Sequence, residues 1–467
     1  MKERVDTLSQ CISFTPKPQI LAHTHTAHTM SATTQAPAST KKSFPYAPSS
    51  WDCLPEEKRA WLEELDPLVE RFAWRLKRRE LAGSTSTALQ TTELLKTYLN
   101  KAPETLNMGE IANLIRQIGK VLTNARQNDL IVGNVVRRVL FILRHACAAY
   151  LRRQAEAQTS RPRSRSTSTT SGATSSGEAL SGSPAQSPSA LDIGSAFAGK
   201  TPQFKAESDG QSAVMSNVDM SVSLHNLYVS SAQWDDLVPY NPLKAHVIQD
   251  VSELAAEITQ AKDAIADQAS QHIFDEDVIL TAGYSSAVLE FLVAGATLRS
   301  FTVFVLESAP SLVGQRMAAE LARHKINVTL LTDAAMVAIM PSVTKILVGS
   351  HAVMADGGIL APSGYAALCL AAKRYAKPVV VLAGLHKVSP LYAFDQTTFN
   401  ELTNPAQILS YDALSGDSDG LVEVLNPVFD YVAPESISLY VTNFGCYQPS
   451  YIYRLLSEYY NVNDYNL

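Results

Sequence analysis

The strongest constraint on the fold is a regular alternation of short apolar runs and helical stripes between about residue 245 and the C-terminus. The runs contain four to six residues, and they predict strands at 278–281, 301–306, 326–331, 343–348, 378–382 and 438–442. Amphipathic stripes among them predict helices at 286–294, 313–323, 365–374 and 449–459. Continuous apolar runs that alternate with helices are typical of a parallel sheet buried on both faces. The sequence therefore predicts an α/β fold, with a Rossmann-like, mainly parallel sheet covered by helices on both sides.

A second folded part is predicted upstream, where apolar residues recur at helical spacing between residues 51 and 153. Asp66 and Pro67 look like an N-cap followed by a first-turn proline, which predicts that a helix begins there. The longest apolar stripe predicts a helix over 129–153. We expect this part to be a helical bundle.

Two polar segments flank the bundle. Residues 1–50 and 154–214 are rich in Ser, Thr, Pro and Ala or Gly, and they hold too little apolar surface to offset the entropy of ordering. We therefore expect a disordered tail at 1–50, a helical domain at 51–153, a disordered linker at 154–214 and a Rossmann-like domain at 215–467. The Arg-Ser run at 161–166 is either part of an inert linker or a site for phosphorylation or RNA contact.

The overall composition excludes several classes of protein. The net charge of −6 provides no general basic field, so we expect no direct nucleic-acid partner. The five cysteines are far apart and show no metal-ligand spacing, which indicates reduced thiols in a cytosolic protein. No apolar run approaches the roughly 18 residues that span a bilayer, so we expect no membrane partner.

The ends of the predicted strands are where a parallel sheet presents its chemistry. Ser286 opens a helix there and is more simply read as an N-cap than as a nucleophile. His351 and Asp356 form either an acid/base pair or a structural turn. No glycine-rich phosphate motif occurs beside them. The sequence therefore predicts no catalytic, cofactor or metal residue.

Three arginines make the predicted helix at 129–153 the most basic of the bundle. Arg137, Arg138 and Arg144 form either a solvated face or a surface for an acidic partner. We keep them as candidate partner-binding residues.

Several stretches carry a resemblance to a known family. Residues 331–336 (LTDAAM) and 346–350 (ILVGS) resemble the family shared by the regulatory subunits of eukaryotic translation initiation factor 2B and two isomerases, of methylthioribose-1-phosphate and of ribose-1,5-bisphosphate. The C-terminal stretches 426–435 and 449–458 resemble the beta-subunit branch of this family.

The resemblance also implies which isomerase groups are missing. The catalytic cysteine of the isomerases falls on Gly283, the catalytic aspartate on Gly358 and the phosphate-binding arginine on Ala309. Because glycine and alanine cannot transfer protons or hold a phosphate, the resemblance implies a chain without isomerase chemistry.

The family likeness implies a non-catalytic regulatory subunit of the complex that exchanges GDP for GTP on initiation factor 2. The implied partners are the alpha, gamma, delta and epsilon subunits of factor 2B, in a heterodecamer, together with factor 2 and especially its alpha subunit, whose phosphorylation the core senses. Apolar sheet edges such as 301–306 are expected to pair with a delta subunit. Two alternatives remain at this point: an active sugar-phosphate isomerase, and an RNA-binding protein that uses the Arg-Ser run.

Overall fold

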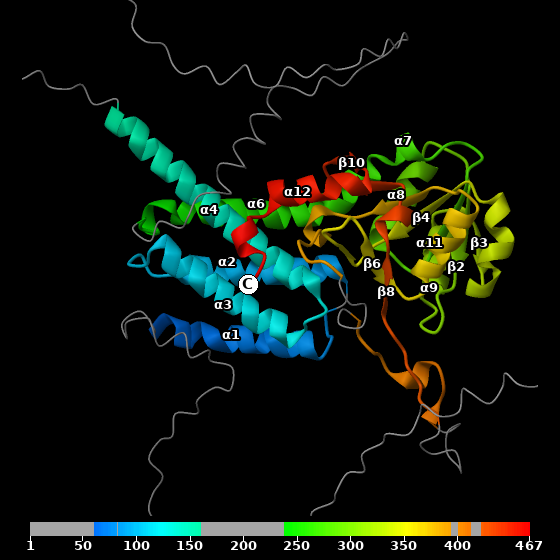
Figure 1. Cartoon of the computed structure of the whole chain (residues 1–467), viewed down its shortest axis with the longest axis horizontal. Helices are drawn as coiled ribbons and strands as arrows, with labels where there is room; N and C mark the ends of the chain where they lie inside the picture. The colour runs from blue at the N-terminus through cyan, green and yellow to red at the C-terminus, as the bar shows by residue number, and fades with distance from the viewer. Residues whose placement is uncertain (1–59, 82, 160–237, 394–399, 412–421) are drawn as a thin grey trace, which may run out of the picture. The chain divides into compact units, whose positions relative to one another are not determined.

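The computed structural model of the chain describes residues 60–81, 83–159, 238–393, 400–411 and 422–467. The expected tail at 1–50, most of the expected linker and the expected start of the second domain at 215 lie outside these described residues. Four helices form the N-terminal part: α1 (Ala60–Lys77), α2 (Ser84–Lys101), α3 (Met108–Ala125) and α4 (Leu130–Thr159) (Figure 1). They share one apolar core, as the helical stripes predict.

Two helix boundaries of the helical part differ by several residues from the sequence prediction. Helix α1 begins at Ala60, so Pro67 lies inside it and Asp66 is not its N-cap. The apolar positions Leu65 and Val69 are buried on both sides of the proline, and this packing outweighs the lost backbone hydrogen bond. Helix α4 continues to Thr159, six residues beyond the predicted end at 153.

Helix α6 (Asn241–Ala266) was not predicted from the sequence, and it joins the two folded parts. Its first turns pack into the core of the helical part through Leu243, Val247 and Val251. Its last turn contributes Ile265 to a core on one face of the sheet. The helical and α/β parts are therefore connected through a continuous helix.

The main sheet confirms the predicted strands. It has the order β10-β9-β7-β4-β1-β2-β3, and every neighbouring pair is parallel except β9 and β10. The strands are β1 (Val278–Ala282), β2 (Thr302–Leu306), β3 (Asn327–Leu331), β4 (Lys345–Gly349), β7 (Val379–Leu382), β9 (Leu439–Thr442) and β10 (Gly445–Tyr447). Because β2 lies between β1 and β3, the expectation that 301–306 forms an apolar edge is wrong. The edge on that side is β3.

Helices cover both faces of this sheet, as predicted. Along β4, Ile346 and Val348 point into one core, while Leu347 points into the other. The first core is closed by α11 (Tyr365–Arg374) and α12 (Ile452–Tyr459), and the second by α7 (Ala269–His272), α8 (Ser286–Ala296) and α9 (Val313–Arg323). The alternation of strand side chains between two apolar layers explains why these runs contain almost no polar residues.

A second, smaller sheet was not predicted. It consists of β5 (Ala352–Val353), β6 (Ile359–Pro362) and β8 (Phe429–Val432), paired antiparallel in the order β5-β6-β8. Its strands have two to four residues, which is too short for a clear alternation of polar and apolar side chains. Of the helices within the described ranges, none has both the length and the apolar character that crossing a bilayer requires.

Candidate functional site

A cavity of about 540 Å³ opens at the carboxyl ends of β1 and β4, where a parallel sheet places its ligand site. The first turn of α2 and the first turn of α8 form two of its walls. The remaining lining residues come from α6, α9, α11, β6 and β8 and from the segments that follow β4 and β7. The lining residues are Gly83, Ser84, Thr85, Ser86, Lys262, Tyr284, Ser285, Ser286, Arg316, Gly349, Ser350, His351, Pro362, Tyr365, Lys387 and Phe429.

The chemistry available in this cavity is limited. None of the described residues that line it is Asp, Glu or Cys. The side chains with ionisable nitrogen are Lys262, Arg316, Lys387 and His351. Burial, together with the charges of Lys387 and Arg126, lowers the pKa of His351 to about 3, so this imidazole is neutral near pH 7 and a poor general base.

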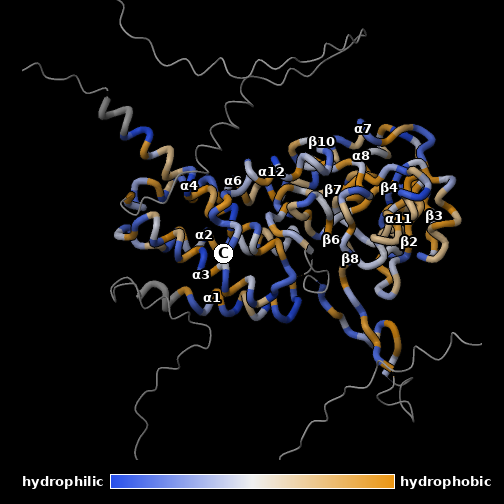
Figure 2. The backbone as a smooth tube through the Cα atoms, in the orientation of Figure 1, coloured by the Kyte–Doolittle hydropathy of each residue, from blue (hydrophilic) through white to orange (hydrophobic). Residues whose placement is uncertain are grey.

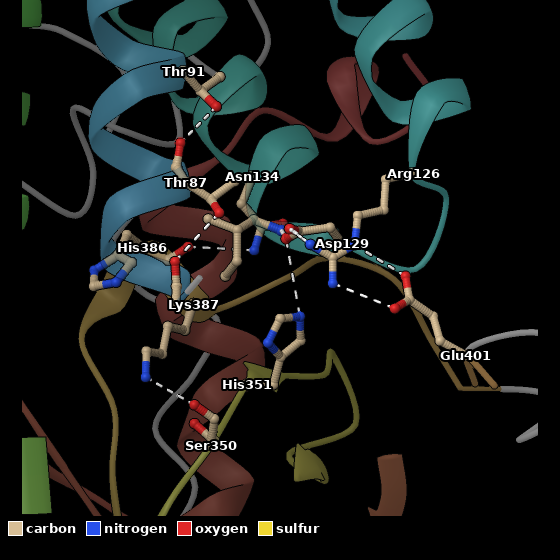
Figure 3. Close-up of polar contacts among 12 residues, drawn as sticks. Thr87, Thr91, Arg126, Asp129, Asn134, Ser350, His351, His386, Lys387 and Glu401 are labelled. Carbon is tan, nitrogen blue, oxygen red and sulfur yellow. Dashed lines mark hydrogen bonds and ion pairs between the residues drawn. The ribbon is translucent and has the colours of Figure 1, made fainter. Parts of the chain in front are cut away.

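Lys387 lines the cavity and is almost fully buried, and Figure 3 shows its side chain directed at Ser350. Its Nζ donates a hydrogen bond of 2.8 Å to the backbone oxygen of Ser350. Burial lowers the pKa of this amine to about 8. The neighbouring His386 is also buried, and burial with the Lys387 charge lowers its pKa to about 3. The Lys387 hydrogen bond joins the segments that follow β4 and β7.

Of the two alternatives for His351 and Asp356, the acid/base pair does not form. His351 points toward Asp129 at the start of α4, with 3.9 Å between its Nε2 and the Asp129 Oδ1, and its ring packs on Phe429. Asp356 lies in the turn before β6, where it accepts hydrogen bonds from the Tyr431 hydroxyl and from the backbone N–H of Gly358. Asp356 therefore has the structural turn role that was one of the two alternatives.

Two of the three positions implied by the isomerase resemblance lie close together. Gly283 has a φ of +58°, and a Cβ built on it would lie 3.2 Å from the Ser308 Oγ. The backbone N–H groups of Ser308 and Ala309 donate to the carboxylate of Asp333, at 3.0 and 2.7 Å. The amides beside Ala309 thus already bind an anion, which is a carboxylate of the chain itself.

None of Gly283, Ala309 and Gly358 is among the residues that line the cavity, and Gly358 lies apart from the other two, in the turn before β6. A Cβ built on it would come within 2.6 Å of the ring and the hydroxyl of Tyr431 on β8. The space beside this glycine is therefore filled by an aromatic side chain. The residues that follow β4 into the cavity are Ser350 and His351 instead.

Two of the three candidate partner-binding arginines are buried inside the chain, so these two form neither a solvated face nor a partner surface. Arg137 and Arg144 are each only 4% exposed. Arg144 pairs with Asp464, and the Arg137 Nε donates to the backbone oxygen of Tyr465 at 3.0 Å. Exchange of Arg137 for Glu would bury a carboxylate near Asp464, so we expect unfolding rather than a selective loss of partner binding.

The third candidate, Arg138, is half-buried and also faces the C-terminal segment. It donates to the backbone oxygen of Tyr459 at 3.1 Å, and its guanidinium lies 3.9 Å from the centre of the Tyr459 ring. Sequence reasoning missed these contacts because the partners are 321 to 328 residues away along the chain. Among the described residues, no group of three or more His, Cys, Asp and Glu side chains is placed to hold a metal ion.

Comparison with known proteins places this chain in a family. The sequence model of the initiation factor 2 subunit family (IF-2B) matches residues 80–449. A relative from Dictyostelium discoideum, named translation initiation factor eIF2B subunit beta, is 35% identical over 405 residues, which cover 85% of this chain and 95% of the relative. The beta subunit of Schizosaccharomyces pombe is 28% identical over 86% of this chain and 98% of its own length. A delta subunit from D. discoideum is 28% identical over 46% of this chain and 36% of its own length.

Solved structures agree with the fold. The crystal structure of eIF2B beta from Chaetomium thermophilum matches with a TM-score of 0.55 and 20% identity. The match covers 87% of this chain and 96% of that structure. A tetrameric eIF2B-beta2-delta2 complex from the same organism contains a chain that matches with a TM-score of 0.53 and 20% identity, covering 86% of this chain and 98% of that one. Since the family model covers more than half of the sequence and a relative above 30% identity is matched over nearly its full length, the chain belongs to the initiation factor 2 subunit family.

Proposed function

We propose that this chain is a beta-type regulatory subunit of the guanine-nucleotide exchange complex for translation initiation factor 2. The observation that carries the proposal is the 35% identity to a named beta subunit, matched over 95% of that relative's length. Because the match extends over almost the full length of a beta subunit, we assign the function of a whole beta subunit to this chain. We place the work of this subunit in the cytosol, where translation initiation takes place.

The chain itself is proposed to be non-catalytic. In the isomerases that the sequence resembles, a thiol and a carboxylate carry the proton transfer, whereas this chain has Gly283 and Gly358 at the corresponding positions. The cavity at the strand ends is also lined by neither group. Loss of one positioned acid or base typically costs about 10²- to 10⁴-fold in rate. The remaining imidazole of His351 is neutral and weakly basic because it is buried. This chemistry supports a contact role rather than sugar-phosphate isomerisation.

The proposed companions are the alpha, gamma, delta and epsilon subunits of factor 2B, and the proposed client is factor 2 with its alpha subunit. A solved complex of similar fold contains two beta and two delta subunits, which supports a delta-type neighbour. The proposal is tested by purifying the tagged chain from cells and identifying the companions by mass spectrometry. Recovery with these subunits in fixed ratios supports it, and recovery as a solitary chain contradicts it.

Because Arg137 and Arg144 are buried, they cannot form the docking surface for factor 2. We propose the end of α1, where Trp74 is 56% exposed. The Lys77 Nζ and the Arg78 guanidinium lie 5.5 and 6.0 Å from the centre of its ring. An exposed tryptophan flanked by cations has the composition of an interface hot spot.

A further inference from the structure

Lys387, the last residue of η5 (Leu385–Lys387), is a buried lysine in a cavity without carboxylates. It is 8% exposed, and none of the described residues that line the cavity is Asp or Glu. Lys345 shows the more usual arrangement: its side chain is 12% exposed, and its Nζ lies 2.7 Å from the Asp277 Oδ2. A buried ammonium that no carboxylate neutralises is costly, because its charge has lost its hydration. Lys387 therefore lies in surroundings that favour the uncharged amine.

The uncharged amine of Lys387 is populated near neutral pH. Burial lowers the pKa of this group from 10.5 to about 8. About 20% of Lys387 is then uncharged at about pH 7.4, which is roughly 250 times the fraction of a lysine with the ordinary pKa. An uncharged amine is a nucleophile, whereas an ammonium is not. Lys387 therefore presents a nucleophilic nitrogen inside a cavity of about 540 Å³.

The same cavity has a positive electrostatic character. Helices α2 and α8 both begin at it, and neither has a side-chain hydrogen bond from its N-cap residue. The uncapped backbone N–H groups and the positive dipole ends of both helices therefore lie at the cavity. Lys262 of α6 adds a cation, while the charge of Arg316 is shared with Glu320 at 3.3 Å. The sheet that ends at the cavity is hydrophobic (Figure 2), so this field favours an anion.

A buried hydroxyl beside Lys387 has no hydrogen-bond partner. Ser350 lines the cavity and is 6% exposed, and its Oγ makes no hydrogen bond with any described residue. Figure 3 shows the Lys387 side chain directed at Ser350, whose backbone oxygen accepts from the amine at 2.8 Å. Buried hydroxyl groups in proteins are normally hydrogen-bonded, because an unpaired one loses the bond that water would give it. The Ser350 hydroxyl therefore points to an acceptor atom that lies next to the Lys387 amine.

We infer that Lys387 is a site of reversible carbamate formation with carbon dioxide. The lone pair of the uncharged Nζ attacks the carbon of carbon dioxide and forms an N–C bond, while one C–O π pair moves onto an oxygen. The nitrogen then releases one proton to water, so one amine and one carbon dioxide give one carbamate anion and one proton, without any oxidant or reductant. The carbamate nitrogen keeps one N–H for the backbone oxygen of Ser350. Its oxygens supply the acceptor that the Ser350 hydroxyl lacks.

Two other classes of electrophile fit this cavity less well. A thioester acyl donor is much larger than carbon dioxide and would have to reach a nitrogen that is almost fully buried. An aldehyde would form an imine, which is again a cation when it is protonated. A carbamate instead replaces the positive charge of Lys387 by a negative one, so the positive character of the cavity favours this product.

The carbamate would lie close to a contact between the two folded parts. The Asn134 side chain on α4 donates to the backbone oxygen of His386 at 3.4 Å, one residue before Lys387. Lys387 itself joins the segments that follow β4 and β7. Carbon dioxide would therefore change the charge at the point where α4 meets the α/β part.

The first test traps the carbamate in the full-length chain as it is recovered from cells. The protein is equilibrated with carbon dioxide, carbamates are ethylated with a trialkyloxonium salt, and the modified lysines are located by peptide mass spectrometry. We expect an ethoxycarbonyl group on Lys387 that is absent from a sample kept free of carbon dioxide. Lys345 is the matched control in the same sample, because it is similarly buried but paired with Asp277. No label on Lys387, or equal labels on Lys387 and Lys345, overturns the inference.

The second test follows the carbamate by NMR with ¹³C-labelled carbon dioxide, without any trapping reagent. The carbamate signal of the wild type should disappear in Lys387→Met, with folding checked by circular dichroism. In Ser350→Ala the amine remains and no existing hydrogen bond of the hydroxyl is lost, so the thermal midpoint should not change. The carbamate signal of Ser350→Ala should be about fivefold weaker at equal carbon dioxide pressure, the effect of one hydrogen bond. A wild type without the signal, a folded Lys387→Met that keeps it, or a Ser350→Ala signal of full strength would contradict the assignment.

Discussion

Arg144 holds Asp464 through two charge-assisted hydrogen bonds, of 2.7 Å from Nε to Oδ2 and 3.0 Å from NH2 to Oδ1. The two residues are 320 positions apart along the chain. Arg116 on α3 adds a third bond of 2.7 Å to the same carboxylate, which is fully buried. The last residues of the α/β part are therefore clasped by two helices of the helical part, so neither part can shift without breaking buried charge contacts.

Removal of the Asp464 carboxylate should strongly destabilise the chain. In the variant Asp464→Asn the Arg144 charge stays buried without its carboxylate, and breaking a buried ion pair in this way costs about 3–5 kcal/mol. Urea denaturation followed by circular dichroism measures the change. Glu435→Gln is the matched control, because the Glu435 carboxylate is 79% exposed beside Lys373 and its loss should leave the midpoint unchanged. Equal urea midpoints for Asp464→Asn and Glu435→Gln would show that the buried Arg144–Asp464 ion pair contributes nothing to folding stability.

The pH dependence of stability should depend on His386. Its pKa is about 3 in the folded chain against 6.5 as its ordinary value, so between these values the unfolded chain binds more protons than the folded one. Folding stability must then rise with pH through this window and fall on acidification.

The variant His386→Gln removes this titration. Because one pKa unit corresponds to about 1.4 kcal/mol, the wild type should lose about 2 kcal/mol more than the variant between pH 6.0 and 4.5. Urea midpoints at both pH values for the two proteins measure the difference. His351 has the same depressed pKa and stays in both proteins, so it cancels in the comparison. If the wild type and His386→Gln lose the same free energy of unfolding between the two pH values, His386 does not cause the pH dependence.

Trp74 should matter for docking and not for folding. Because its ring is 56% exposed, Trp74→Ala should leave the thermal midpoint near the wild-type value. Binding of the assembled complex to factor 2 should weaken by about 2 kcal/mol, or roughly 30-fold, if the ring is a hot spot. Tyr453→Ala, at 71% exposure on α12, is the control for a surface aromatic outside this patch. If Trp74→Ala and Tyr453→Ala bind factor 2 with equal affinity, the docking surface does not lie at the end of α1.

The main architecture could be predicted from the sequence because its signals are local. Each buried strand of the parallel sheet is a continuous apolar run, and α9 and α11 begin and end at the predicted residues. The small sheet was missed because its strands are very short and because β6 pairs with β8 across a long stretch of sequence. The predicted start of α1 at Pro67 was wrong, because tertiary packing outweighed the local signal of the proline.

The site was harder to predict because it depends on pairings between distant segments. A basic face on α4 looks the same in sequence whether it meets solvent, a partner or the C-terminus, and only the fold brings Asp464 and Tyr465 to it. The same is true of Arg126 and Glu401, which are 275 residues apart. The position of Gly358 in a turn that Tyr431 covers also follows from strand pairing and not from any local motif.

The central claim is that this chain regulates nucleotide exchange on factor 2 without catalysing a reaction of its own. The most direct measurement is GDP release from factor 2 by the exchange complex reconstituted with and without this chain, using unmodified factor 2 and factor 2 phosphorylated on its alpha subunit. We expect that the chain alone releases no GDP, and that the complex needs the chain both for full exchange and for inhibition by the phosphorylated form. Exchange and inhibition that stay unchanged when the chain is left out would contradict it.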